Sequence, residues 1–323
     1  MRDAATCSII DRIMPLAANH PRSLNLFAFA RAALAAAPLA VAPACVLALG
    51  SRWADWQRMV AVAVAVFAAA KWLSFAEFLE QGPAGGKLAT PKIALRIAGY
   101  FVLWPGMDPR PFFANSTAAA RPRTREWFLA WGITLLGLLV LAAAARLATA
   151  DPFLAGWLGI AGFLLALHFG WFHLLSLGWR RAGIAAVPIM NAPFVAASLA
   201  DFWGRRWNLA FRDLAHRFVF RPTVAAFGPA VATLLVFLTS GLAHDAVVSL
   251  PVRGGYGGPT AYFLIQGLAM LFERTVLARR IGIGRGRLGW AYTQLVVFAP
   301  AALLFHRPFV ERAMAPLLVV LPF

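Results

Sequence analysis

Long apolar segments follow one another along this chain and are separated by short polar stretches. A membrane-crossing helix needs about 20 consecutive apolar residues, because the bilayer core is about 30 Å thick and a helix rises about 1.5 Å per residue. The segments that approach or exceed this length are 26–49, 59–79, 127–147, 153–177, 224–243, 259–278 and 288–305. We therefore expect an all-α, polytopic membrane protein with about seven to nine transmembrane helices.

Other apolar segments are broken by residues that disrupt helices. Segment 93–113 ends around Pro105 and Pro109, and segment 183–200 contains Pro188 and Pro193. Proline removes a backbone donor and clashes with the preceding helical turn. These two segments are predicted to be re-entrant or broken elements that do not cross the membrane. A last apolar piece near the C-terminus is too short to cross.

The composition agrees with a lipid environment and with one integral membrane domain over residues 1–323. Hydrophobic residues make up 61% of the chain, charged residues 13%, and the mean hydropathy is +0.71. Residues 1–25 lack the long apolar run of a signal peptide and are predicted to be a cytoplasmic segment. The two cysteines, Cys7 and Cys45, offer neither a disulfide framework nor metal-ligand spacing, and we expect no metal site.

Basic residues concentrate in a few of the polar stretches. The richest are 121–125, 180–181, 205–221 and 279–287, and the net charge is +17. Lysine and arginine gather in the cytoplasmic loops of membrane proteins and face anionic lipid there. This pattern places the four stretches and the N-terminus in the cytoplasm, and favours membrane lipid over nucleic acid as a partner. A polyanionic ligand would approach from the same side.

The stretch "DFWGRRWNLAFRDL", residues 201–214, combines aromatic, basic and amide side chains. As a helix over 202–218 it would carry an aromatic stripe (Trp203, Trp207, Phe211, Leu214, Phe218) beside a polar one (Arg205, Asn208, Arg212). One interpretation is an interfacial helix with rings at headgroup level and arginines on lipid phosphate. However, Asn208 adds no anchoring, Gly204 leaves room beside the backbone, and arginine and amide donors suit a phosphate or a pantetheine amide.

A histidine ends the apolar run that follows. In "TSGLAHD", residues 239–245, His244 lies at the edge of a predicted span and Gly241 permits a close approach. An ionisable group in or near a membrane span is costly, so it is treated as a functional candidate. A neutral imidazole can take a proton from a hydroxyl near neutral pH. The alternative is a hydrogen-bonded histidine at the membrane boundary with no chemical role.

Together, "SLADFWGRRWN" (198–208) and "SGLAHD" (240–245) resemble the membrane-bound O-acyltransferase family, in particular its wax synthase-like branch. Members of that branch carry a Phe-Trp-Gly-x-x-Trp-Asn signature ahead of a Ser-Gly-x-x-His-(Glu/Asp) signature. "LWPGMDPR" (103–110) is also similar to a stretch of bacterial members. The resemblance covers roughly residues 70–310.

The resemblance implies a helical membrane fold with a tunnel, in which acyl-CoA enters from the cytosol and an alcohol enters from the bilayer. The implied reaction moves a long-chain acyl group to the hydroxyl of a lipophilic alcohol, as in wax ester synthesis, with acyl-CoA as co-substrate and no other cofactor. His244 and Asn208 match the catalytic positions, and Asp245 stands where glutamate is common. The expected substrate-binding residues are Trp203, Arg205, Arg206, Trp207, Arg212, Ser240 and Asp245.

Other functions stay open at this point. The same chemistry could act on diacylglycerol, a sterol, a lysophospholipid or a polysaccharide hydroxyl, or the site could bind lipid without turnover. A transporter would use intramembrane ionisable groups as an ion path, and the candidates are Lys71, His168, His173 and Glu273. No repeated halves support a transporter. The simple topology puts His244 at the opposite end of its span from Asn208, unless a break at Gly228 brings it inward.

Overall fold

The computed structural model describes residues 33–82, 93–113 and 119–322. Within these ranges the chain forms helices and connecting turns and no strand, which confirms the all-α prediction. The predicted N-terminal segment 1–25, together with Cys7, lies outside the described residues.

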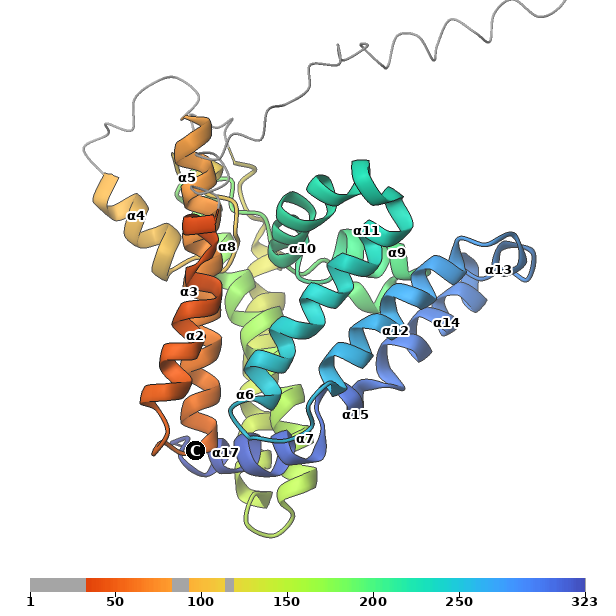
Figure 1. Ribbon diagram of the computed structural model, residues 1–323. Coiled ribbons are helices and arrows are strands. Elements are labelled where there is room, and N and C mark those ends of the chain that lie inside the picture. The colour runs from red at the N-terminus through yellow and green to blue at the C-terminus, as the bar shows by residue number, and fades with distance from the viewer. Residues whose placement is uncertain (1–32, 83–92, 114–118, 323) are drawn as a thin grey trace, which may run out of the picture.

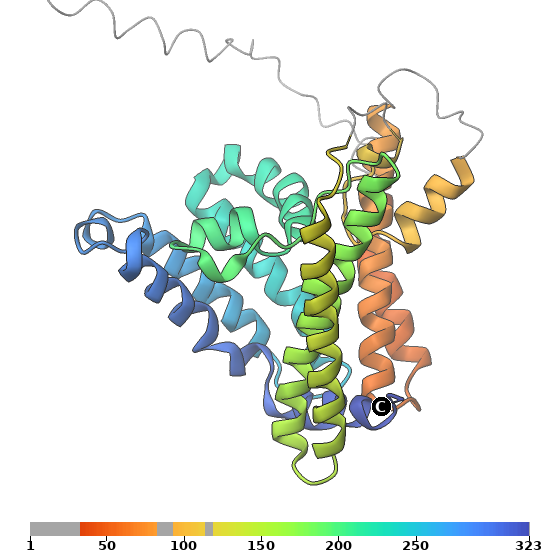
Figure 2. The same ribbon diagram turned by 180° about the vertical axis from the view of Figure 1, so that it is seen from behind.

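Long helices form the N-terminal half of the molecule. Their bounds are α2 (Pro38–Leu49), α3 (Asp55–Gln81), α4 (Ile93–Val102), α5 (Arg110–Phe113), α6 (Thr124–Leu147), α7 (Pro152–Phe163) and α8 (Phe172–Arg181). A π-helical segment, Leu164–Trp171, joins α7 to α8 without a break. Figures 1 and 2 show α3, α6 and the α7–α8 rod standing side by side.

Shorter helices and π-helical turns alternate in the C-terminal half. The bounds are α9 (Leu199–Asp201), α10 (Leu209–Ala215), α11 (Arg221–His244), α12 (Gly258–Glu273), α13 (Val276–Arg280), α14 (Gly286–Phe298), α15 (Ala301–Leu304), α16 (Arg307–Phe309) and α17 (Ala315–Val319). Figure 1 shows α12 and α14 running obliquely to α3, with the α13 turn at their outer end.

Four helical stretches in the described ranges are long and apolar enough to cross a membrane: Asp55–Gln81, Thr124–Leu147, Pro152–Arg181 and Leu209–Ser249. A fifth is possible if the pair Gly286–Leu304 and Arg307–Val319, bent by 66°, counts as one span. The multi-pass membrane class is confirmed, whereas the count of seven to nine crossings stays a prediction. The structure ends α12 at Glu273, before the predicted boundary at 278, and starts the first described apolar helix at Ala33.

Small residues bring α6 and the α7–α8 rod into close contact. A Cβ added at Gly162 would lie 2.8 Å from Leu141 Cγ, and one added at Gly137 would overlap the backbone of Ala166. Membrane helices associate through such small residues because lipid gives no hydrophobic force between them. Close packing at these glycines therefore joins α6 to the rod.

One expected chain break is confirmed, and the break considered at Gly228 is present. Residues Gly183–Ala192 form no helix and a single 3₁₀ turn follows at Pro193–Val195, so segment 183–200 is broken as predicted. Gly228, with φ 75° and ψ 168°, interrupts α11 before Pro229.

We call one side of the bundle the arginine-rich end. It is where α3 ends, α6 begins and α8 ends, with α10 and the α13 turn on the same side (Figure 1). Its arginines include Arg121, Arg123, Arg125, Arg180, Arg181, Arg205, Arg206, Arg212, Arg217, Arg279, Arg280, Arg285 and Arg287. Ion pairs tie some of them to neighbouring elements, as Arg217 is tied to Glu77 of α3 at 2.6 Å.

Candidate active site

The predicted continuous helix over residues 202–218 is wrong, because the chain breaks in its middle. Trp207 is extended (φ −95°, ψ 126°) and Asn208 is left-handed (φ 40°, ψ 62°). Asparagine tolerates this conformation because its short polar side chain can bond locally, and Asn208 Oδ1 accepts a 3.4 Å hydrogen bond from Phe211 N–H. Within the described residues Asn208 Nδ2 makes no hydrogen bond, so it can donate to a ligand.

The arginines beside Asn208 are oriented by contacts with the same segment. Asp201 accepts hydrogen bonds from Arg205 Nε at 2.9 Å and from Arg206 Nε at 2.5 Å. Arg212 donates to the carbonyl oxygen of Gly204 at 3.0 Å. The Arg205 side chain is 76% exposed, and its terminal amino groups bond to no described residue. The predicted anion-binding arginines thus share one surface at the arginine-rich end.

His244 occupies the last position of α11 and has a defined tautomer. Its Nδ1 lies 2.7 Å from the carbonyl oxygen of Ser240. A carbonyl can only accept, so Nδ1 carries the hydrogen and Nε2 of the neutral ring keeps its lone pair. The backbone carbonyl of Ser240 thus orients the His244 ring. The predicted close approach at Gly241 is confirmed, since an added Cβ would lie 2.6 Å from Thr260 Cα of α12.

A row of aromatic rings connects the two candidate residues. The His244 ring lies 4.5 Å from the Phe263 ring, centre to centre. Phe263 lies 5.7 Å from Trp203, which lies 6.4 Å from Trp207, the neighbour of Asn208. We call Phe263, Trp203 and Trp207 the aromatic bridge. The structure brings both motifs to one apolar interior. Asn208 and His244 lie at opposite ends of the aromatic bridge and are not in contact.

A fully buried glutamine holds the centre of the aromatic bridge. Gln266 Oε1 accepts from Trp203 Nε1 at 3.3 Å, and Gln266 Nε2 donates to the carbonyl oxygen of Val296 at 2.8 Å. Buried polar groups need partners, because an unpaired one costs about 1–3 kcal/mol. Gln266 therefore fixes the Trp203 ring relative to α12 and α14, a contact that sequence spacing did not predict.

The carboxylate of Asp245 contacts the start of α12. This carboxylate accepts from Gly257 N–H at 2.9 Å, Thr260 N–H at 3.1 Å and Thr260 Oγ1–H at 2.5 Å. Ser249 Oγ–H also donates to it at 2.8 Å. A negative charge is favourable at a helix N-terminus, where the first N–H groups lack partners. Asp245 therefore anchors the end of α11 to α12, while its substrate-binding role stays a prediction.

His306, which no motif marks, extends this anchor. His306 is 9% exposed, and its Nδ1 accepts a 3.3 Å hydrogen bond from Phe309 N–H. The neutral ring then carries its hydrogen on Nε2, which lies 3.1 Å from Ser249 Oγ. Hydrogen bonds thus connect His306 to Ser249 and Ser249 to Asp245. Asp245 directly follows His244 in the sequence.

Lys71 holds the loop that contains "LWPGMDPR". It is fully buried, and its Nζ donates to the carbonyl oxygens of Tyr100 at 2.8 Å and Gly106 at 2.5 Å. The same Nζ lies 3.6 Å from the centre of the Tyr100 ring, a cation–π contact. These contacts give Lys71 a structural role in positioning residues 103–110.

Residues 186–265 match the sequence profile of a family described as the membrane bound O-acyl transferase family. Asn208, His244 and the aromatic bridge all lie within the matched residues. This part of the chain is similar to the membrane-bound O-acyltransferase family. This confirms the resemblance that the two motifs indicated.

Curated proteins that are similar to part of this chain are named as O-acyltransferases. The chain is 31% identical to "Probable long-chain-alcohol O-fatty-acyltransferase 7" of Arabidopsis thaliana, over 44% of this chain and 48% of that protein. It is 31% identical to "Long-chain-alcohol O-fatty-acyltransferase" of Simmondsia chinensis, over 29% of each. It is 37% identical to "Acyl-CoA--sterol O-acyltransferase 1" of Arabidopsis thaliana, over 26% and 28%. The chain spans less than half the length of each of these relatives.

Proposed function

We propose that this protein transfers a long-chain acyl group from acyl-CoA to the hydroxyl of a lipophilic alcohol. The observation that carries the proposal is the tautomer of His244. The Ser240 carbonyl occupies Nδ1, which leaves Nε2 as a base at the edge of an aromatic-lined interior. The names of the relatives support an alcohol as acceptor.

In the proposed step the alcohol oxygen attacks the thioester carbonyl carbon while His244 Nε2 takes the hydroxyl proton. The new C–O bond forms, the C–S bond breaks, and the imidazolium returns its proton to the leaving thiolate of CoA. Because one transfer step balances all atoms and charges, the proposal requires no acyl-enzyme. The aromatic bridge would border the acyl chain and exclude water.

Asn208 is proposed to act at the CoA side of the same substrate. Its unbonded Nδ2 suits an amide carbonyl of pantetheine, and the exposed guanidinium of Arg205 suits a CoA phosphate. Arg206 and Arg212 would extend this phosphate surface. Because the aromatic bridge separates Asn208 from His244, Asn208 would hold the CoA arm while His244 acts on the hydroxyl.

We propose that the protein lies in the cytoplasmic membrane. Its arginine-rich end is proposed to face the cytoplasm. Basic residues of short loops favour that side, and acyl-CoA is supplied there. Single cysteines placed at Arg280 and Arg146, in a Cys7→Ala/Cys45→Ala background, would test this orientation. A membrane-impermeant maleimide applied to intact cells should label the cysteine at 146 and leave the one at 280 unlabelled; the reverse pattern would refute it.

The first experiment uses purified protein in detergent with labelled palmitoyl-CoA and four acceptors: hexadecanol, diacylglycerol, a sterol and a lysophospholipid. We expect ester on hexadecanol, and His244→Ala should lower the rate by about 10²–10⁴-fold, the usual contribution of a general base. His216→Ala, which changes an exposed histidine outside the aromatic interior, is the matched control. A folded, monodisperse His244→Ala protein with full activity would refute the proposal.

A sterol is the second candidate acceptor, because one relative is named as an acyl-CoA–sterol O-acyltransferase. The same acceptor panel decides between them, since competing hexadecanol and sterol in one reaction gives the ratio of their specificity constants. Transfer to the sterol alone would keep the chemistry and change the substrate.

A further inference from the structure

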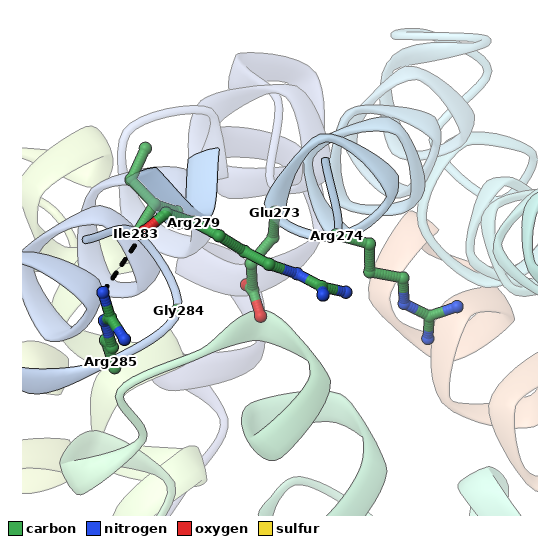
Figure 3. Close-up of a pocket in the computed structure, with 6 residues that line it drawn as sticks. All are labelled: Glu273, Arg274, Arg279, Ile283, Gly284 and Arg285. Carbon is green, nitrogen blue, oxygen red and sulfur yellow. Dashed lines mark hydrogen bonds between the residues drawn. The ribbon is translucent and has the colours of Figure 1, made fainter. Parts of the chain in front are cut away.

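A cavity of about 330 Å³ opens at the outer end of α12, where the chain turns through α13 into α14. It is lined by Glu273, Arg274, Arg279, Ile283, Gly284 and Arg285 (Figure 3). It belongs to the arginine-rich end and does not include any residue of the proposed reaction.

The three arginines of the cavity lack acidic partners. Within the described residues none of their guanidinium groups forms an ion pair. Arg285 donates to the backbone carbonyl of Arg279 at 3.4 Å, and Arg274 contacts the sulfur of Met270 at 3.8 Å. Most of their donors therefore stay available. A concave surface with several unpaired guanidinium groups attracts a multivalent anion.

Glu273, the one acidic residue among the described residues that line the cavity, is hydrogen-bonded outside it. Glu273 accepts a 2.6 Å hydrogen bond from Leu199 N–H at the start of α9. Figure 3 shows its carboxyl group pointing to the ribbon segment below, while Arg274 and Arg285 lie on either side. Gly284 packs against it, since an added Cβ would lie 3.2 Å from Glu273 Cγ. The carboxylate is thus held beside the loop, and the cavity keeps an excess of positive charge.

We propose that this cavity binds a phosphate group of an anionic ligand, and that an anionic phospholipid headgroup is the principal source. Val276, Leu277 and Ile281 of the same turn are each more than half exposed. Aliphatic side chains next to arginines are typical of an element at the lipid interface, with the chains in hydrocarbon and the arginines at phosphate level. The alternative source, a phosphate of CoA, rests on the proposed function and already has Arg205 and Arg212 as candidates.

The bound headgroup would act on the reaction through Glu273. A ligand that bridges the arginines fixes the α12–α14 turn, and the Glu273–Leu199 hydrogen bond links that turn to α9. The segment that follows α9 carries Trp203 and Asn208. Anionic lipid would therefore favour one position of the acyl-CoA-binding segment and raise the transfer rate.

The test compares two double variants with the same loss of charge. Arg279→Gln/Arg285→Gln removes two cavity arginines, whereas Arg280→Gln/Arg287→Gln removes two exposed arginines of the same turn that do not line the cavity. Delipidated protein is titrated with phosphatidylglycerol or phosphatidylcholine and analysed by native mass spectrometry. We expect the cavity variant to bind phosphatidylglycerol at least about tenfold more weakly, with the control variant and phosphatidylcholine binding unchanged.

A second arm separates the two sources of phosphate and needs no turnover. Equilibrium dialysis measures the binding of CoA and dephospho-CoA to the same proteins. A cavity variant that loses CoA affinity but keeps phosphatidylglycerol affinity would assign the phosphate to CoA and overturn the lipid source. Unchanged binding of both, or equal losses in the control variant, would overturn the cavity site. Because both arms measure binding, their outcome is independent of whether the protein transfers an acyl group.

Discussion

The Asn208 end of the candidate site is organised by charge, whereas the His244 end is organised by hydrogen bonds that the chain makes with itself. At the first end Asp201 orients two arginines, and exposed guanidinium groups stay open to a ligand. At the second end Ser240 orients the base and Asp245 fixes the helix end. A polyanion can thus be held at one end while proton transfer takes place at the other, away from competing charges.

The largest expected effect concerns stability at the His244 end. Asp245→Ala removes the acceptor for four hydrogen bonds and should lower the free energy of unfolding by about 2–4 kcal/mol. Thermal unfolding in detergent measures it. Asp151→Ala, which removes the N-cap of α7, is the matched control and should cost about 1 kcal/mol. Equal losses in the two variants would show that Asp245 is an ordinary cap.

The next effect separates the amide of Asn208 from its backbone conformation. Asn208→Gly keeps the left-handed conformation and removes the side chain, so it should raise the KM for acyl-CoA about tenfold, as expected when a hydrogen bond to the ligand is lost. Asn208→Ala should show the same KM change and lose about a further 1 kcal/mol of stability from strain. A glycine variant with an unchanged KM would contradict a ligand-binding role for the amide.

The smallest effect tests the charge at the exposed surface. Arg205→Gln should raise the KM for acyl-CoA about two- to fivefold at low salt, and less at high salt, because exposed charges are screened. Arg146→Gln, an exposed arginine at the opposite end of α6, should leave the KM unchanged. A change that is independent of salt would show that Arg205 acts through structure.

The membrane class and the candidate residues of the two motifs could be predicted from the sequence, because both depend on local patterns. Apolar runs report burial in lipid directly, and Gly228 before Pro229 reports a chain break. The helix over 202–218 was predicted wrongly because rings spaced by three and four suit one helix as well as two helices separated by an extended Trp207. Local spacing carries no information about a left-handed Asn208.

Long-range contacts explain the rest of what the sequence did not predict. His306 meets Ser249, 57 residues away, only after α12 and α14 have brought the chain back. Gln266 meets Trp203, 63 residues away, because α12 folds back against α11. The side chains themselves are ordinary in type, and no motif marks them. Their roles follow from the fold alone.

Lys71 also links the stability of α3 in the bilayer to a later part of the chain. A lysine at the middle of a membrane helix costs about 2.5–3.5 kcal/mol on insertion scales. Its partners, the carbonyl oxygens of Tyr100 and Gly106, lie 29 and 35 residues later in the chain. Lys71 of α3 therefore lacks its final hydrogen-bond partners until residues 93–106 have emerged and folded against it. The full stability of α3 in the bilayer is thus reached only when the two segments have packed together.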